Sequence, residues 1–428
     1  MIMGITFYGG AGEVGRSCIH LEHQKKSILL DCGIKLGEKI EYPLINEEKT
    51  IKNVIISHAH LDHSGYLPHM FTKKTKPEVF MTKPTRDLLG VLLADYCNLQ
   101  EQKAFTQKEV NTIMQEAKII EYHEPLRKGF TITMHYAGHI MGSAMIKLRN
   151  NKNTILYTGD ICTRKTRILA PAEMGIRADT LIMETTYGGK NDYLPTFKDS
   201  YGKLIKSINE TLDEGGHVLI PCFAVGRAQE ILMALDDYMR SGAMKPTRIF
   251  IEGMIGKTMR IYRHNAYYAN EDIKKRILMS DSDPFKSESF HKSISKTRDD
   301  VLKEPCIVVS TSGMLSGGPV LFYIKKLANN PKNKMIFVGY QAEGTRGKKI
   351  ISGERKIEID GQEIEIKMKI DQIKISGHSD FNELLQFAKS VKGLKRVFLI
   401  HGEKTDLKEY LEKDYEVYIP KLLESFEI

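Results

Sequence analysis

The residues best suited to chemistry stand in the stretch NVIISHAHLDHSG, at residues 53–65. An apolar strand comes first, and His58, His60, Asp62 and His63 then follow within six residues. His58 and His60 are two apart, so in extended chain both rings point to one side. Imidazole and carboxylate groups suit zinc, and four of them at a strand end can hold two metal ions. The alternative is a polar loop of hydrogen-bonded histidines, which the density of ligand-type residues disfavours.

A second stretch, FYGGAGEVGRSC, carries the G-x-G-x-x-G pattern of a dinucleotide-binding turn at residues 10–15. Such a turn opens a helix and leads to a strand that ends in an acid. KSILLDCG supplies a strand that ends at Asp31, but the intervening RSCIHLEHQKKS alternates with the period of two that is typical of a strand. We therefore predict an antiparallel hairpin turning at residues 24–26, with the glycines forming a tight loop between strands.

The predicted order of strands and helices changes along the chain. Strands interspersed with helices are predicted first, and among them NTILYTGD and ADTLIMETT are apolar strands that lead to Asp160 and Glu184. After Gly188, regular strand–loop–helix units predict a separate, mainly parallel, doubly wound sheet. A hairpin signal at Asp360-Gly361 then follows, and RVFLIHGE is a further strand. The sequence therefore predicts one domain, formed by residues 1–187 and 345–428, that is interrupted by a second domain at residues 188–344.

The bulk composition fits this division. A chain of 428 residues is expected to form two or three domains. No apolar run approaches the roughly 18–20 residues of a membrane span, and the amino terminus lacks the features of a signal peptide. Six scattered cysteines without a C-x-x-C pattern indicate reduced thiols in a cytoplasmic protein. The net charge of +9 has the sign expected for a polyanion partner.

These motifs, in this order, resemble the metallo-β-lactamase superfamily, whose fold is an αββα sandwich. Asp31 in LLDCG, His139 in AGHIMGS and Asp160 in LYTGD resemble its first, third and fourth motifs. Glu184 in LIMETTYGG, His378 in ISGHSD and His401 in LIHGE resemble motifs A, B and C of the β-CASP nucleases, in which a β-CASP domain interrupts the sandwich. AVGRAQE, TSGMLSGGP and GYQAEGTRG look like the cleavage and polyadenylation specificity factor type, including its archaeal relatives. Those relatives often begin with KH domains, which we do not expect here because the hydrolase motifs start at once.

The resemblance implies a role for each matched residue. His58, His60 and His139 would bind one Zn²⁺, Asp62, His63 and His401 a second, and Asp160 would bridge the two. Two zinc ions per chain would activate a hydroxide that attacks phosphorus, leaving a 5′-phosphate and a 3′-hydroxyl. The catalytic residues beyond these ligands would be His378 as general acid, Glu184 as its orienting partner and Asp31 as a positioning group.

Substrate binding is expected in the inserted domain. The glycines and serines of STSGMLSGGP precede a helix, where backbone N–H groups suit a phosphate, although a plain α/β turn is equally compatible. Basic side chains nearby can line an anionic groove or be solvated surface charges. The candidate substrate-binding residues are Ser310, Ser312, Gly313, Arg227 and Arg346, with Lys348 and Lys349 beside them.

The function implied is a zinc-dependent ribonuclease of the RNA 3′-end processing or decay type. We expect an endonuclease, with 5′–3′ exonuclease activity left open because the same site supports both. The alternatives are a catalytically weak RNA-processing scaffold subunit, a DNA-acting β-CASP nuclease and a small-molecule metallohydrolase of the same fold. Single-stranded RNA is the expected partner. From the resemblance we also expect a homodimer, with LLESFEI as a contact between the two copies. An RNA-processing complex is a further expected partner.

Overall fold

The computed structural model describes the chain except for residues 1–2, 25, 38, 46–50, 100–103 and 280–282. The chain forms two compact units. The first comprises Met1–Lys165, Leu169–Tyr193 and Gly377–Ile428, and the second comprises Thr166–Ile168 and Leu194–Ser376. The second unit is therefore an insertion in the first.

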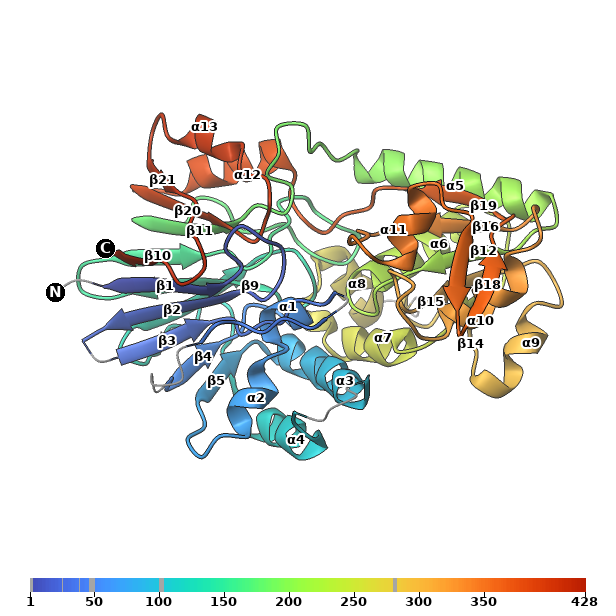
Figure 1. The fold of residues 1–428 in the computed structure, drawn as a ribbon. Helices are drawn as coiled ribbons and strands as arrows, with labels where there is room; N and C mark the ends of the chain where they lie inside the picture. Colours follow the sequence, from blue (N-terminus) through green and yellow to red (C-terminus); the bar gives the residue numbers. More distant parts are fainter. Residues whose placement is uncertain (1–2, 25, 38, 46–50, 100–103, 280–282) are drawn as a thin grey trace. The chain divides into compact units, whose positions relative to one another are not determined.

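The first unit is built on two seven-stranded sheets (Figure 1). The first sheet has the order β22-β1-β2-β3-β4-β5-β6 and the second the order β21-β20-β11-β10-β9-β8-β7. The strands of the first sheet are β1 Gly4–Gly9, β2 Cys18–His23, β3 Lys26–Leu30, β4 Asn53–Ile55, β5 Glu78–Met81, β6 Lys118–Ile119 and β22 Ser425–Glu427. The strands of the second sheet are β7 Leu126–Arg127, β8 Thr131–Tyr136, β9 Ala144–Arg149, β10 Thr154–Tyr157, β11 Thr180–Glu184, β20 Arg396–Ile400 and β21 Glu416–Tyr418.

The alternation of side chains along each strand builds two layers of core. In β10, Ile155 and Tyr157 face the first sheet and pack in the central cluster, which includes Phe7 of β1. Leu156 between them points to the opposite face and belongs to a second cluster, which includes Phe387 of α12. This is the period of two that a strand imposes when both of its faces are covered.

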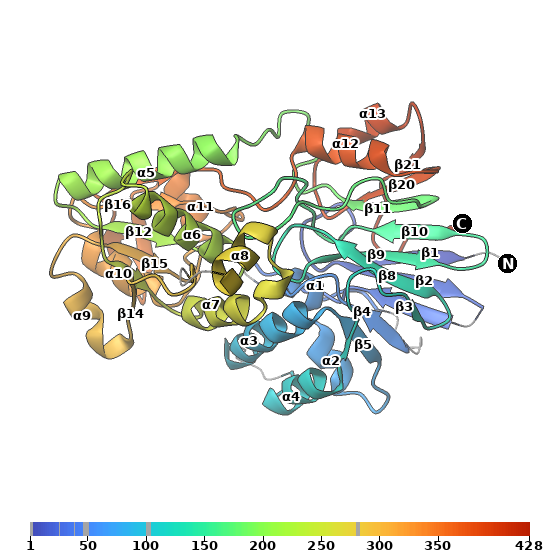
Figure 2. The same ribbon diagram turned by 180° about the vertical axis from the view of Figure 1, so that it is seen from behind.

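Helices cover the outer faces and complete an αββα sandwich. Helices α1 to α4 lie on the outer side of the first sheet, and α12 and α13 cover the second (Figures 1 and 2). Their bounds are α1 Leu61–Ser64, α2 Leu67–Phe71, α3 Lys83–Leu99, α4 Gln107–Glu116, α12 Phe381–Ser390 and α13 Leu407–Leu411. Helix α12 begins with a capping box, in which the Asp380 side chain and the Glu383 side chain each bond the other's backbone N–H.

The glycine-rich amino terminus forms the predicted hairpin. Strand β1 pairs antiparallel with β2, and β2 pairs antiparallel with β3. The chain between β1 and β2 contains the G-x-G-x-x-G pattern, and Gly10, Gly12 and Gly15 all have positive φ. Glycine adopts positive φ more readily than any other residue, so the pattern serves a tight loop and not a dinucleotide turn.

The second unit contains a six-stranded sheet of order β14-β13-β15-β12-β16-β19, in which every pairing is parallel. Helices lie on both sides of it (Figures 1 and 2), as the strand–loop–helix pattern predicted. The strands are β12 Val218–Pro221, β13 Ile249–Ile251, β14 Phe290–Lys292, β15 Ile307–Ser310, β16 Lys334–Phe337 and β19 Lys369–Gln372. The helices are α5 Phe197–Asp213, α6 Arg227–Arg240, α7 Ile255–His264, α8 Glu271–Met279, α9 Arg298–Val301, α10 Val320–Leu327 and α11 Arg346–Ile351, with 3₁₀ turns at Ala266–Tyr268 and Ser295–Thr297.

Residues 345–376 belong to the second unit, whereas the sequence placed the return to the sandwich at residue 345. The hairpin of β17 (Lys356–Ile359) and β18 (Gln362–Glu365) turns at Asp360-Gly361, both with positive φ, as its sequence predicted. Its apolar side chains pack in the core of the second unit, and β19 then joins the edge of the sheet beside β16. The chain consequently re-enters the first unit at Gly377.

Among the described residues, no helix is both long and apolar enough to cross a membrane.

Candidate metal centre

The four ligand-type residues of NVIISHAHLDHSG lie where strand β4 gives way to helix α1. His58 and His60 occupy the connecting segment, and Asp62 and His63 lie in the short helix. His58 and His63 are fully buried, while Asp62 keeps 32% of its side chain exposed. Two ligand-type groups of the first unit form around them, one with His139 and Asp160 and one with His401.

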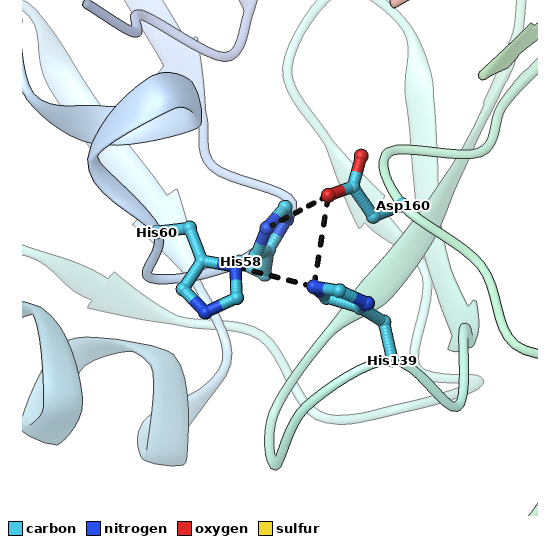
Figure 3. Close-up of side chains that lie close together, drawn as sticks. All are labelled: His58, His60, His139 and Asp160. Carbon is cyan, nitrogen blue, oxygen red and sulfur yellow. Dashed lines mark hydrogen bonds and ion pairs between the residues drawn. The ribbon is translucent and has the colours of Figure 1, made fainter. Parts of the chain in front are cut away.

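The first group consists of His58, His60, His139 and Asp160 (Figure 3). Nε2 of His139 lies 3.1 Å from Nδ1 of His60. The Oδ2 atom of Asp160 lies 3.5 Å from Nε2 of His58 and 3.6 Å from Nε2 of His139. Three imidazole nitrogens and one carboxylate oxygen therefore converge, which is a donor set that suits zinc.

The second group consists of Asp62, His63 and His401. Nε2 of His401 lies 3.6 Å from Oδ2 of Asp62, and Nε2 of His63 lies 4.0 Å from the same oxygen. The Oδ1 atom of Asp160 lies 3.2 Å from Nε2 of His63. Asp160 thus turns one carboxylate oxygen toward each group, so a single carboxylate faces both sets of ligand-type atoms.

Hydrogen bonds fix which ring nitrogen each histidine offers. His63 Nδ1 lies 2.7 Å from the Asp31 carboxylate, and His139 Nδ1 donates to the Gly377 carbonyl at 2.9 Å. Ser17 Oγ lies 2.7 Å from Nδ1 of His401, and Ser57 Oγ lies 3.0 Å from Nδ1 of His58. With Nδ1 engaged in these four histidines, Nε2 is left to face the site, whereas His60 turns Nδ1 toward His139.

Asp31 accepts several of the hydrogen bonds that hold these histidines in place. It lies at the end of β3 with φ +57°, and its side chain is completely buried. Its carboxylate accepts hydrogen bonds from the Ser57 backbone N–H at 2.6 Å, the Ser57 hydroxyl at 2.7 Å and the Tyr157 hydroxyl at 2.6 Å. One residue therefore positions His63 directly and His58 through Ser57.

The amino-terminal glycine loop also supports the site. Ser17 N–H donates to the Asp62 carbonyl at 2.8 Å, and His401 N–H donates to the Gly10 carbonyl at 2.7 Å. Gly33 packs so closely that a Cβ there would lie 1.7 Å from the Asp62 carbonyl oxygen. The hairpin, the α1 turn and the end of β20 are thus held together by backbone contacts around the second group.

Three polar atoms at the centre of the two groups are buried without a hydrogen-bond partner in the described part of the chain: His58 Nε2, His63 Nε2 and Asp160 Oδ1. Buried polar atoms are almost always paired, and each unpaired one costs roughly 1–3 kcal/mol. Bound cations would satisfy all three atoms. The residues present therefore fit metal ions.

The protonation equilibria of three of these side chains agree with metal binding. His63 differs, because burial lowers its pKa but Asp160 and Asp62 outweigh burial and hold that pKa well above the usual value, so a bound cation would have to displace a proton there. Burial, reinforced by His63, holds the pKa of His58 well below its usual value, and burial with His378 does the same to the pKa of His139. Burial raises the pKa of Asp160, but His63, His401 and His58 outweigh it and hold the pKa well below its usual range. Neutral imidazoles and an ionised carboxylate are the forms that bind metal.

Beside these groups, Glu184 orients His378. The carboxylate oxygens of Glu184 lie 3.0 and 3.1 Å from Nδ1 of His378, and Glu184 is completely buried. Glu184 also accepts from the Ile161 and Thr186 backbone N–H groups, at 2.7 and 3.3 Å. Nε2 of His378 lies 4.0 Å from Oδ2 of Asp160, and 21% of the His378 side chain is exposed. His378 thus turns Nε2 toward Asp160 of the candidate metal centre, with part of its side chain exposed.

The candidate substrate residues lie in the second unit; Ser310 ends strand β15, and the others follow strands of its parallel sheet. Ser312 Oγ accepts from the Gly317 N–H at 3.3 Å, and Gly313 packs against Phe223. Arg227 is the first residue of α6 and is buried. Arg346 donates to the Glu358 and Leu315 carbonyls at 2.8 and 3.1 Å, so its guanidinium holds loops together. Ser310 is completely buried, which leaves its side chain no access to a substrate.

Sequence reasoning missed the positioning groups Ser17, Ser57, Tyr157 and the Gly377 carbonyl. Ser57 precedes His58 directly and could have been noticed. The others reach the site only through the fold and carry no local signal.

Comparisons with known proteins agree with this geometry. Three family models match along the chain: a metallo-beta-lactamase superfamily domain over residues 20–186, a Beta-Casp domain over 228–350, and a Zn-dependent metallo-hydrolase RNA specificity domain over 363–420. The chain therefore belongs to the metallo-β-lactamase superfamily, in its β-CASP nuclease branch.

Individual relatives extend the match over almost the whole chain. The RNase J-like protein of Methanocaldococcus jannaschii is 38% identical, over 94% of this chain and 92% of that protein. The transcription termination factor FttA of Methanothermobacter thermautotrophicus is 36% identical, over 97% of this chain and 69% of that factor. A crystal structure of a protein of unknown function from Enterococcus faecalis V583 covers the full chain with a TM-score of 0.62 at 15% identity, which shows a shared fold.

Proposed function

We propose that this protein is a ribonuclease that binds two Zn²⁺ ions per chain and hydrolyses single-stranded RNA, leaving a 5′-phosphate and a 3′-hydroxyl. The observation that carries the proposal is the position of Asp160, whose two oxygens face two separate groups of ligand-type side chains. Adjacent divalent ions lower the pKa of a water molecule and offset charge on phosphate oxygens. His58, His60 and His139 would hold one ion, Asp62, His63 and His401 the other, and Asp160 both.

The chain's own residues supply the proton for the leaving group. Glu184 accepts from Nδ1 of His378 and fixes the ring, so that Nε2 points toward the centre and can donate its proton to the departing 3′-oxygen. The buried Glu184 is itself held by two backbone N–H groups, so the ring has a rigid support. Asp31 acts through His63 and Ser57 and is a positioning residue.

RNA is favoured as substrate by the match of residues 363–420 to an RNA specificity domain and by the RNase J-like relative. In the second unit, the loops that contain Ser312 and Gly313, together with Arg227, are the proposed contacts to the strand. A scaffold role is disfavoured because every ligand position is filled and supported. The RNA-processing complex and the cytoplasmic location belong to the same proposal, and relatives named transcription termination factors are compatible with work on newly made RNA.

We also propose that two copies of the chain form a homodimer. The LLESFEI segment forms β22, which pairs with β1 at the edge of the first sheet, with Phe426 packed against the core. An edge strand offers unpaired backbone groups on its other side to a second copy. Sedimentation equilibrium of the full chain tests this, with a monomer at all concentrations as the contradicting result.

The test of the function is incubation with internally labelled RNA that carries either a 5′-triphosphate or a 5′-monophosphate, with and without a chelator. Chelator-sensitive cleavage of both RNAs at internal positions is expected. Equal cleavage with the chelator would contradict the proposal. Trimming only of the monophosphate RNA from its 5′ end would identify an exonuclease, and cleavage of single-stranded DNA at the same rate would remove the preference for RNA.

A further inference from the structure

The second unit contains a cavity of about 290 Å³ that the proposed function does not use. Its residues come from the end of β13, helix α7 and the segment that leads into and through β14. Ile251 and Lys292 are the last residues of the neighbouring parallel strands β13 and β14. The cavity therefore lies at the carboxyl ends of strands in an open parallel sheet, which is where such sheets bind ligands.

The interior of this cavity is apolar and partly aromatic. Met259, Phe285 and Phe290 line it together with Ile251. Phe285 is buried, whereas Phe290 is only half-buried and keeps part of its ring accessible. An accessible aromatic ring beside aliphatic and thioether groups suits a flat, weakly polar group such as a nucleobase.

The remaining wall is basic. Arg260, His264, Lys286 and Lys292 are exposed residues of the cavity lining. None of these four forms an ion pair with any described residue, and no described lining residue is acidic. The fifth basic residue, Arg263, is paired with Asp283. Unpaired cations around an apolar slot create a positive potential that attracts an anion.

We propose that this cavity binds a nucleoside phosphate, with the base in the slot beside Phe290 and the phosphate on Arg260 and Lys292. The ligand has two sources: a free mononucleotide or one unit of an RNA strand. The strand source rests on the proposed RNA substrate, whereas the free nucleotide does not. The site belongs wholly to the second unit, so its residues are separate from those of the metal centre.

Two kinds of variant test the cavity. Arg260→Glu with Lys292→Glu reverses its charge. Gly256→Leu fills it, because Gly256 lines the cavity, lies in α7 and has no atom within 4 Å of its missing Cβ. The matched controls lie on α5: Lys203→Glu with Lys206→Glu on exposed lysines, and Gly202→Leu at another helical glycine with open space. Thermal melting confirms that each variant folds.

Binding of a fluorescein-labelled oligouridylate is followed by anisotropy with a chelator present to stop cleavage, and binding of AMP by titration calorimetry. We expect Gly256→Leu to weaken RNA binding about 5- to 150-fold, the range for loss of one stacked base. The charge reversal should lower the slope of log affinity against log salt by about 0.7, for one lost phosphate contact on a single strand. The α5 controls should bind like the wild type.

AMP binding that Gly256→Leu abolishes would support the free mononucleotide. Weaker RNA binding in both cavity variants, without AMP binding, would support a unit of the strand. Unchanged binding of both probes in both cavity variants overturns the proposal. If this happens while the wild type cleaves RNA, the ribonuclease function stands and the cavity site falls. If the wild type binds AMP but does not cleave RNA, and Gly256→Leu abolishes the AMP binding, the cavity site stands and the ribonuclease function falls.

Discussion

Nδ1 of His63 lies 2.7 Å from the carboxylate of Asp31, and both side chains are shielded from solvent. Asp31 also accepts three further hydrogen bonds, from the Ser57 N–H and hydroxyl and from the Tyr157 hydroxyl. A carboxylate behind a metal-binding imidazole fixes its tautomer and raises its basicity. Asp31 therefore holds His63 in place, and it would act on a bound ion only through that ring.

Asp31→Asn is expected to lower zinc affinity by about 10- to 100-fold, the usual effect of losing such a partner. The amide keeps the shape of the side chain but cannot accept from all of its neighbours. Competition with a chromogenic chelator measures the affinity. Tyr157→Phe, which removes one hydrogen bond to the same carboxylate, is the matched control and should change affinity less. An Asp31→Asn protein with wild-type zinc affinity would show that the contact is not functional.

His378→Ala is expected to slow RNA cleavage about 10²- to 10⁴-fold, the usual contribution of a general acid. Its zinc content should stay at the wild-type value, because His378 is not among the proposed ligands. Single-turnover cleavage and metal analysis on the same preparation measure the two quantities. Loss of zinc in His378→Ala would instead show that His378 is a metal ligand, which its Nε2 could be because it lies 4.0 Å from Oδ2 of Asp160.

Gly33→Ala is expected to disrupt the site through the backbone. The added Cβ would meet the Asp62 carbonyl at 1.7 Å and push apart the end of β3 and the α1 turn. A lower melting temperature and weaker zinc binding should result. Gly202→Ala is the control, because its Cβ has open space in the middle of α5 and should stabilise the protein by about 0.5–1 kcal/mol. Equal melting temperatures for the two variants would contradict the packing described.

Stability at mildly acidic pH should depend on His69. Burial lowers its pKa to about 4 and outweighs the opposing effect of a backbone hydrogen bond with Tyr66, on whose ring His69 stacks at 4.7 Å. In the unfolded chain the pKa of His69 is about 6.5. Between about pH 4 and pH 6.5 the His69 ring is therefore protonated in the unfolded state but neutral in the folded state, so the proton stabilises the unfolded state. Stability is therefore full above about pH 6.5 and falls as the pH drops toward 4. His69→Phe keeps the stacking and should lose less stability over this range, as urea unfolding at several pH values would show. An identical pH dependence in both proteins would contradict the assignment.

Much of the fold and site could be predicted because their signals are local. The H-x-H-x-D-H cluster, the period-two hairpin and the strand–loop–helix units are each contained in a short stretch. His139, Asp160 and His401 were reached only through the family resemblance, because no local pattern shows that they meet His58. The Gly377 carbonyl, the Ser17 hydroxyl and the pairing of β22 with β1 depend on contacts between distant segments. The placement of residues 345–376 in the second unit likewise depends on β19 joining its sheet.

In the proposed centre, Asp160 joins two metal ions held by residues from distant parts of the chain. Elemental analysis of the purified protein, after dialysis against zinc, measures how many ions it holds. We expect two zinc ions per chain in the wild type, about one in His401→Ala, and a loss in Asp160→Ala that exceeds the loss in His401→Ala. A wild-type protein with one ion or none per chain, or an Asp160→Ala protein that keeps both ions, would contradict it.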